Sequence, residues 1–279
     1  MRVRYSFSCR HTGKIDNIKK QRKTYPKIVD EIIKISDLIL EVLDARFPEE
    51  TRNKELEEQI EKKGKRIIYV LNKSDLVNVQ KKQHELPKDM KPYIFISSKN
   101  RLSTAKLRDF LKREVRKIEL GEHMTRFHVG IVGYPNTGKS TLINVLTGKS
   151  AAGTGAQAGF TRGMQKIRLT SDILVLDTPG VIPDKEYSTT EQGKLSKHAK
   201  LSARDASRVK NPELAVAALM RDYSKEIEGF YKIEAKGDAE ILLDVLGKQR
   251  GYLKKGGVSD DDRTARLVLR DWQLGNIQV

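Results

Sequence analysis

Short apolar runs rich in β-branched residues alternate, over the first two thirds of the chain, with stretches whose apolar positions recur at helical spacing. The expected strands are Leu38–Leu43, Arg66–Leu71, Tyr93–Ser97, Phe127–Val132, Gln165–Thr170 and Asp172–Asp177. Residues 51–63 and 102–117 have helical composition and lie between successive strands. This alternation predicts an α/β domain with a mostly parallel sheet flanked by helices. Only Ser171 separates the last two runs, so we expect them to form an antiparallel hairpin at one edge.

The strand pattern stops near residue 186, and three amphipathic stretches follow. We expect helices over 212–230, 238–249 and 260–273. Ser259 is the expected N-cap of the third helix. The chain therefore divides into an α/β domain over residues 1–186, which begins with a basic segment over 1–34, and a small helical domain over 187–279.

The chain of 279 residues carries 54 Lys and Arg against 37 Asp and Glu, a net charge of +17. No apolar run is long enough to cross a bilayer, and the N-terminus lacks the apolar core of a signal peptide. A single cysteine, Cys9, excludes an internal disulfide and a cysteine zinc cluster. We therefore expect a soluble, cytoplasmic protein without a membrane partner. The positive charge favours a polyanionic partner such as nucleic acid.

The positive charge is unevenly distributed. Residues 1–34 hold ten basic residues against three acidic ones, and residues 194–210 hold six basic residues against Asp205 alone. Both stretches are candidates for contacts with phosphate backbone. The alternative is that they are solvated helix faces.

Residues 133–140 read GYPNTGKS and match the phosphate-binding loop G-x-x-x-x-G-K-[ST]. The run FHVGIV supplies the strand before it, and a helix is expected to open at Lys139. The two glycines let backbone amides wrap phosphates at a helix N-terminus. Lys139 is expected to reach the β- and γ-phosphates, and Ser140 to bind magnesium. The nucleotide-binding residues expected in this loop are Asn136, Thr137, Gly138, Lys139, Ser140 and Thr141.

The tetrapeptide Asp177-Thr178-Pro179-Gly180 closes another apolar strand. An acidic residue there is expected to hold magnesium through water, and the Gly180 amide to contact a γ-phosphate. Between the two motifs, Thr161 in a glycine-rich loop is a candidate for a second magnesium oxygen. The alternative for Thr161 is a purely structural turn.

Asn72-Lys73-Ser74-Asp75 ends the strand RIIYVL and has the form of the base-reading motif N-K-x-D. Asp75 can accept from the ring N–H and the exocyclic amine of guanine together, a pattern that adenine does not present. Asn72 is expected to brace the loop, and the Lys73 stem to pack on the base. Ser97, Ser98 and Lys99 follow the next strand and are expected to form a second base-contacting loop.

The order of these motifs differs from that of Ras-like GTPases, because the base-reading motifs precede the phosphate loop. The chain therefore resembles a circularly permuted GTPase. Asp44-Ala45-Arg46 in DARFP resembles the D-A-R-x-P signature of the YlqF/YawG group. The tail resembles the C-terminal element of that group at Lys255, Gly256, Gly257, Asp260, Arg263, Asp271 and Gly275.

The resemblance implies a Ras-like P-loop GTPase that converts GTP to GDP with Mg²⁺ and acts in ribosome assembly. It also implies a ribosomal subunit precursor and ribosomal RNA as partners, and we expect a monomer. The permutation places the C-terminal part directly after DTPG, so nucleotide state is expected to pass through residues 181–200. A nucleotide-gated RNA-binding or RNA-chaperone module with incidental hydrolysis is the alternative, and a membrane-surface GTPase is a weaker third.

The residues expected to support hydrolysis are Lys139, Thr161, Gly180 and Asn136. Val181 stands where Ras-like enzymes carry the water-positioning glutamine, so we expect slow intrinsic hydrolysis. Asn136 matches an asparagine that helps related GTPases to hold a potassium ion near the phosphates, the alternative being ordinary loop chemistry. For His11, a surface position is favoured over a catalytic role.

Local basic clusters are the expected RNA contacts of the C-terminal domain, because residues 187–279 carry little net charge. Three of the arginines share one face of the last expected helix, opposite Val268 and Trp272. Local pairing with Asp262 and neighbouring acids is the alternative. The RNA-binding candidates are Lys248, Arg250, Lys254, Lys255, Arg263, Arg266 and Arg270.

Overall fold

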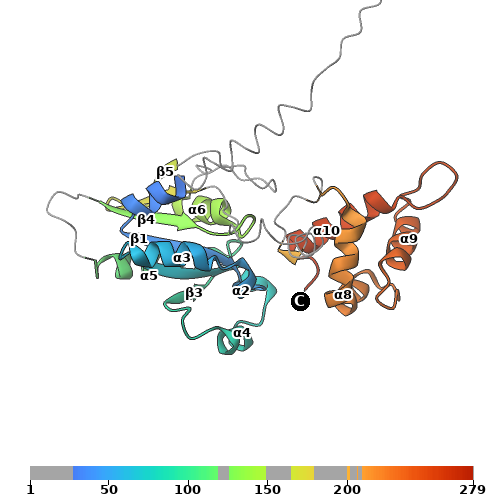
Figure 1. Ribbon diagram of the computed structural model, residues 1–279, viewed down its shortest axis with the longest axis horizontal. Helices are drawn as coiled ribbons and strands as arrows, with labels where there is room; N and C mark the ends of the chain where they lie inside the picture. The colour runs from blue at the N-terminus through green and yellow to red at the C-terminus, as the bar shows by residue number, and fades with distance from the viewer. Residues whose placement is uncertain are drawn as a thin grey trace, which may run out of the picture.

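The computed structural model describes residues 28–118, 126–148, 165–178, 200–201, 206 and 209–278 (Figure 1). The six predicted strands are present and form one sheet. They are β1 (Leu38–Asp44), β2 (Arg66–Asn72), β3 (Tyr93–Phe95), β4 (Phe127–Val132), β5 (Gln165–Arg168) and β6 (Ile173–Asp177). The sheet order is β3-β2-β1-β4-β6-β5, and only the pairing of β5 with β6 is antiparallel. This confirms the mostly parallel sheet and its edge hairpin.

Both faces of the sheet are covered by helices, as the nearly continuous apolar character of β1 requires. Alternate residues of β1 point to opposite sides: Leu40 packs with α5 (Arg101–Val115) and α6 (Lys139–Thr147), and Ile39 packs with α3 (Lys54–Lys62). The carboxyl ends of β1, β2, β4 and β6 consequently meet at one edge of the sheet, where ligands bind in open α/β folds.

The single helix expected over 51–63 is wrong. The chain instead forms a short α2 (Pro48–Thr51) and a separate α3, because Arg52 is extended and the Asn53 side chain accepts from Leu56 N at 3.1 Å to cap the second helix. The sequence pattern also missed a 3-10 turn η1 (Ser74–Leu76) and the exposed helix α4 (Val79–Glu85).

The C-terminal part contains the three expected helices: α8 (Pro212–Tyr231), α9 (Ala239–Gln249) and α10 (Asp261–Leu274). The N-cap prediction for the last of them is wrong by one residue. Asp260 is the cap, and its carboxylate accepts from Arg263 N at 3.2 Å. No helix in the described part of the chain is long and apolar enough to span a membrane. The expected domain boundary near residue 186 lies outside the described residues.

Two side chains of the α/β part belong to the apolar core of the C-terminal helices. Phe47, just after β1, and Tyr134, in the phosphate loop, are buried with residues of α8, α9 and α10. The Phe47 and Trp272 rings are stacked with centroids 6.1 Å apart. Tyr223, at a kink in α8, contacts both rings. The helical part is thus packed directly against the loops that carry the nucleotide motifs.

Candidate nucleotide-binding site

The phosphate loop follows β4 and needs glycine at two positions. Gly133 has φ +145° and Gly138 has φ +95°, both in the region that other residues rarely adopt. A Cβ on Gly133 would collide with the Val42 carbonyl, and one on Gly138 with the Asn72 amide. The motif glycines therefore allow the loop to lie against the neighbouring strand ends. Asn136 also has a positive φ of 61°.

Lys139, the first residue of α6, is buried in the centre of the loop. Its ammonium donates to the carbonyl oxygens of Gly133 at 3.0 Å and Tyr134 at 2.7 Å. Burial lowers the pKa of Lys139 to about 8, although the nearby Asp177 carboxylate opposes this shift. A lysine held in this way presents a positive charge at a helix N-terminus, which suits it to phosphate.

Ser140 and Asp177 meet at the ends of neighbouring elements. The Ser140 hydroxyl donates to Asp177 Oδ2 at 3.4 Å, and β6 is held beside β4 by parallel pairing. Thr178, directly after β6, donates from its hydroxyl to the Ile131 carbonyl in β4 at 2.7 Å. A hydroxyl and a carboxylate oxygen this close are the ligand types that Mg²⁺ prefers, so the donor set fits that ion.

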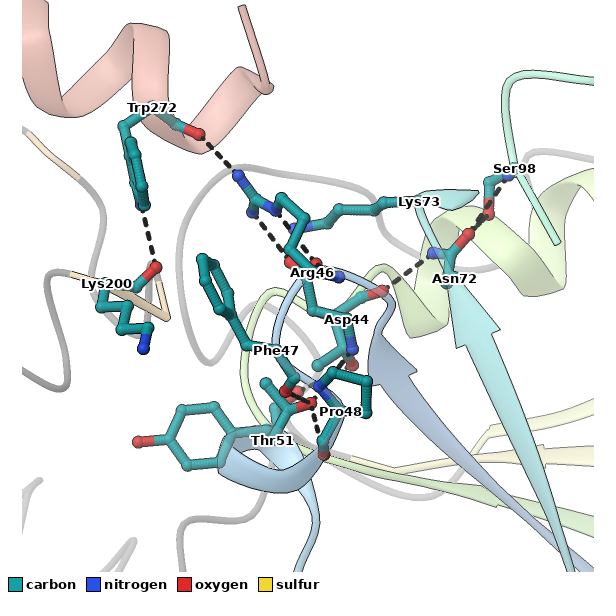
Figure 2. A network of polar contacts seen from close by, with 12 residues as sticks. Asp44, Arg46, Phe47, Pro48, Thr51, Asn72, Lys73, Ser98, Lys200 and Trp272 are labelled. Carbon is teal, nitrogen blue, oxygen red and sulfur yellow. Dashed lines mark hydrogen bonds and ion pairs between the residues drawn. The ribbon is translucent and has the colours of Figure 1, made fainter. Parts of the chain in front are cut away.

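Asn72, the last residue of β2, connects three loops. Its amide nitrogen donates to the Thr137 carbonyl in the phosphate loop at 2.8 Å. Its carbonyl oxygen accepts from the Ser98 backbone N–H at 3.2 Å and from the Ser98 hydroxyl at 2.9 Å (Figure 2). The side chain is buried, and these hydrogen bonds hold the loops together at its position.

Asp75 lies in η1 with its carboxylate facing the loop after β3. Lys99 Nζ is 3.4 Å from Asp75 Oδ2. Burial alone raises the pKa of Asp75, but hydrogen bonding from Ser97 and the charge of Lys99 outweigh it and lower the pKa below its ordinary value. Asp75 is therefore held as a carboxylate, the form that accepts hydrogen bonds from guanine.

Lys73 adopts the left-handed conformation, with φ 62° and ψ 33°. Its ammonium donates to Asp44 Oδ2 at 2.8 Å (Figure 2). Asp44 and Arg46 were noticed in the sequence only as part of a family signature. The contact of Asp44 with Lys73 has no signal in the sequence, because it joins residues 29 positions apart.

The structure brings the base-reading and phosphate motifs together, but several expected site residues lie outside the part of the chain that it describes. These are His11, Thr161, Gly180 and Val181. Thr141 is exposed on the first turn of α6. The expected coupling segment 181–200 also falls largely outside the described residues.

The basic candidates of the C-terminal part differ in their surroundings. Arg266 is occupied locally: it donates to both carboxylate oxygens of Asp262, at 2.7 and 3.0 Å, and to the Ala206 carbonyl at 2.8 Å. Arg263 lies over the Tyr252 ring at 4.1 Å. Lys254 and Lys255 are exposed in a loop closed by a β-bridge between Leu253 and Ser259.

Further candidates lie at the end of α9, in the loop after it and on α10. Lys248 Nζ is 2.7 Å from Asp244 Oδ2 within α9, and in the loop Lys254 Nζ is 3.8 Å from Asp260 Oδ1. Arg250 and Arg270 are exposed. Among these candidates, Arg266 is the most fully paired with neighbouring groups. Lys254 and Lys255 are exposed, so their ammonium groups are accessible at the surface.

Comparison with solved structures supports the fold. The chain is similar to a GDP-bound structure of TM YlqF, with a TM-score of 0.61 and 24% identity over 88% of this chain and 94% of that one. A GNP-bound YlqF from T. maritima gives the same TM-score and identity over 93% and 94%. In this chain, strand β2 with the N-K-x-D motif precedes the phosphate loop. The chain has a YlqF-like fold and carries its nucleotide motifs in a circularly permuted order.

Sequence comparisons find similar archaeal and eukaryotic proteins that are described as GTP-binding. The chain is 41% identical to an uncharacterized GTP-binding protein, MJ1464, of Methanocaldococcus jannaschii, covering 90% of this chain and 65% of the relative. It is 30% identical to the nuclear GTP-binding protein NUG1 of Saccharomyces cerevisiae, covering 93% and 56%. The chain thus spans between about half and two thirds of the length of these relatives.

A family model described as 50S ribosome-binding GTPase matches residues 128–247. The match begins in β4, just before the phosphate loop, and leaves the base-reading residues outside. This is the outcome expected for a permuted GTPase, in which those residues come earlier in the chain.

Proposed function

We propose that this protein is a GTP-hydrolysing switch of ribosome biogenesis, which binds a ribosomal subunit precursor in a nucleotide-dependent way. The observation that carries the nucleotide part is the hydrogen bond from Asn72 to Thr137, because it holds the base-reading motif beside the phosphate loop. The ribosomal part rests on the family description of the match over residues 128–247. A cytoplasmic, monomeric protein fits this role.

The proposed nucleotide contacts follow from the chemistry at each loop. The Asp75 carboxylate accepts from the guanine ring, while Lys139 and the amides of the phosphate loop hold the phosphates. Ser140 would ligate Mg²⁺ directly, with Asp177 acting through water. Bound Mg²⁺ supplies neutralisation of charge on the phosphate oxygens. Thr161 and Gly180 are proposed to complete the γ-phosphate side of the site.

Hydrolysis is proposed to be slow in the isolated protein. Val181 supplies no group that could orient water, and phosphoryl transfer depends on such positioning. The positive φ of Asn136 places it at a bend of the phosphate loop. A potassium ion held with its help would add positive charge beside the phosphates and compensate in part.

The C-terminal helices are proposed to contact ribosomal RNA. Lys254 and Lys255 lie in an exposed loop, and the neighbouring Arg263 is positioned 4.1 Å over the Tyr252 ring. Exposed ammonium groups contribute to RNA affinity through phosphate contacts. Arg266 is the weakest of the candidates, because its guanidinium is already bonded to Asp262 and Ala206.

Sedimentation with ribosomal subunits tests the proposal. The full chain should travel with a subunit in the presence of a non-hydrolysable GTP analogue and be released with GDP. Association that is the same in both nucleotide states and in their absence would refute the switch.

The alternative is a nucleotide-gated RNA-binding module with incidental hydrolysis. Turnover of GTP separates the two, because the switch predicts acceleration by subunits. An RNA-binding module predicts the same rate with and without them.

A further inference from the structure

The Asp44 carboxylate, at the end of the central strand β1, is shared by two cations. Arg46 donates from Nε to Oδ1 at 3.0 Å and from Nη2 to Oδ2 at 2.8 Å. Lys73, from the base-reading motif, donates to the same Oδ2 at 2.8 Å (Figure 2). Asp44 and Arg46 are almost completely buried, with side-chain exposures of 2% and 0%. Their geometry is therefore fixed by this pairing, since a buried charge without its partner is strongly unfavourable.

Arg46 also reaches the last helix of the protein. Its third donor, Nη1, bonds to the backbone carbonyl of Trp272 in α10 at 3.1 Å, across 226 residues of sequence (Figure 2). A guanidinium can serve a carboxylate and a carbonyl together because its donors form a rigid planar fork. One carboxylate and one guanidinium thus connect Lys73 to the backbone of α10.

The electrostatics of the cluster show that both cations act on Asp44. Burial alone raises the pKa of that carboxyl, but the charges and hydrogen bonds of Lys73 and Arg46 outweigh it and hold the pKa well below its ordinary value. Withdrawing either cation would leave Asp44 with a less favourable environment. Moving Lys73 away would therefore change the electrostatic interaction between Asp44 and Arg46.

A second contact links the same two regions. Gly275, the C-cap of α10, has φ +75°, and a Cβ at that position would collide with the side chain of Leu76. Leu76 directly follows Asp75 in η1. The base-reading loop therefore comes close to the end of α10 at Leu76, next to Asp75, and is connected to it a second time through Lys73, Asp44 and Arg46.

We propose that Asp44 is a positioning residue for Lys73 and that, through Arg46, it transmits the occupancy of the guanine site to α10. This relay, Lys73–Asp44–Arg46–Trp272, rests on the proposed function, since it requires Lys73 to contact the base. The relay responds to the base and not to the γ-phosphate. It therefore distinguishes the empty protein from both nucleotide states, whereas a path through residues after DTPG would distinguish GTP from GDP.

The alternative is a static clamp that holds the two parts of the protein together equally with and without nucleotide. A static clamp leaves nucleotide affinity and the environment of α10 independent of each other, whereas a relay makes each depend on the other, because coupling between two sites is reciprocal. Tyr134 offers a competing route, since this phosphate-loop side chain is buried in the core of the C-terminal helices.

Trp272 is the single tryptophan of the chain and reports on α10 directly. Its indole N–H donates to the Lys200 carbonyl at 2.9 Å, and its ring packs on Phe47 and Tyr223. We expect GDP and a non-hydrolysable GTP analogue to change the tryptophan emission of the full chain to the same extent. A response to the GTP analogue alone would overturn the relay.

Three variants separate the relay from its alternatives. Arg46→Lys keeps a cation near Asp44 but loses the planar guanidinium that bonds to Asp44 and Trp272 together. It should therefore abolish the emission change and weaken GDP binding about five-fold or more. Lys73→Ala should lose the emission change even at saturating GDP. Glu50→Gln is the matched control, because it removes the negative charge that pairs with Lys200 at 2.8 Å, near Trp272, without touching the relay, and it should keep the response.

Calorimetry of GDP binding, run beside the fluorescence, makes each outcome decisive. GDP binding without any emission change in the parent protein would overturn the relay. A full response in Arg46→Lys would also overturn it and assign the signal to Tyr134. Absence of GDP binding to the parent protein would instead refute the proposed function. Thermal unfolding of the variants confirms that the comparison is made on folded protein.

Discussion

The side-chain amide of Asn72 donates a hydrogen bond of 2.8 Å to the backbone carbonyl of Thr137, across 65 residues of sequence. This contact joins the loop expected to read the base to the loop expected to hold the phosphates. In a permuted chain the two loops belong to segments in reversed order, so their relative position depends on tertiary contacts of this kind. The neighbouring Gly138 has no Cβ, which leaves room for the amide.

Replacing Asn72 by Ala should weaken GDP binding at least ten-fold and lower the free energy of unfolding by about 1–3 kcal/mol, because buried partners are left unsatisfied. Isothermal calorimetry and denaturant unfolding measure the two effects. Asn78→Ala is the control: it removes the cap of the exposed helix α4, so stability should fall while GDP affinity stays unchanged. Equal GDP affinities in the two variants would contradict the bracing role.

Lys139 gives the nucleotide site a pH dependence. Its pKa of about 8 lies below the ordinary value of 10.5, so between these values the unfolded chain binds the extra proton. The stability of the nucleotide-free protein should therefore rise with pH over that interval, and the cost of the buried ammonium should be fully present below it. Phosphate binding requires the ammonium, so GDP affinity should fall as pH rises through about 8.

Calorimetric titrations from about pH 6.5 to about pH 8.5 check this dependence. Ser140→Ala should bind GDP more weakly but keep the pH dependence. Lys139→Ala should be weak throughout and lose it. A pH profile for Lys139→Ala that matches the parent would assign the ionisation to another group.

The sheet could be predicted from the sequence because the strands β1, β2 and β6 are nearly continuous apolar runs, and the mostly polar β5 (QKIR) follows from its place beside β6 in a hairpin. The division of residues 51–63 into two helices could not, because it depends on the Asn53 side chain capping α3. The cap of α10 was missed for a related reason: Ser259 and Asp260 are both good cap residues, and only the backbone geometry selects Asp260.

The candidate site was predictable where chemistry is local. The phosphate loop and the N-K-x-D motif each place their residues within a few positions of a strand end. The Asp44–Lys73 and Arg46–Trp272 contacts were not predictable, because nothing in the spacing of these residues shows that β1 ends beside the base-reading loop. The packing of Tyr134 into the C-terminal core could not be predicted either, because its position within the phosphate-loop motif indicates only a loop residue.

Turnover should depend on the monovalent cation if Asn136 helps to hold one near the phosphates. GTP hydrolysis by the isolated protein should be slow, and it should be faster in potassium than in sodium. Asn136→Ala should remove that difference without lowering GDP affinity more than a few-fold. Equal rates in the two salts for the parent protein would eliminate the cation but leave acceleration by ribosomal particles untouched.

RNA affinity should depend on the exposed lysines of the loop before α10. Combined Lys254→Ala and Lys255→Ala should reduce the slope of log affinity against log salt by about two, because each lost phosphate contact lowers it by about one. Arg266→Ala is the comparison within the same region and should leave the slope unchanged, since this guanidinium is bonded to Asp262 and Ala206.

Filter binding of ribosomal RNA by the full chain at several salt concentrations measures these slopes. Lys81→Ala with Lys88→Ala removes two exposed lysines of the α/β part and controls for net charge. If that pair changes the slope as much as Lys254→Ala with Lys255→Ala, the RNA contact is not localised to the C-terminal loop.

Exchange of base specificity at Asp75 tests the guanine site most directly. The measurement is the affinity of the parent protein and of Asp75→Asn for GDP and for xanthosine diphosphate, with unfolding curves to show that both are folded. The parent should prefer GDP, and the variant should prefer xanthosine diphosphate and lose GDP affinity by roughly two orders of magnitude, because its amide faces the guanine donors with an N–H group. An Asp75→Asn variant that binds GDP as tightly as the parent would contradict the assignment of the base-reading loop.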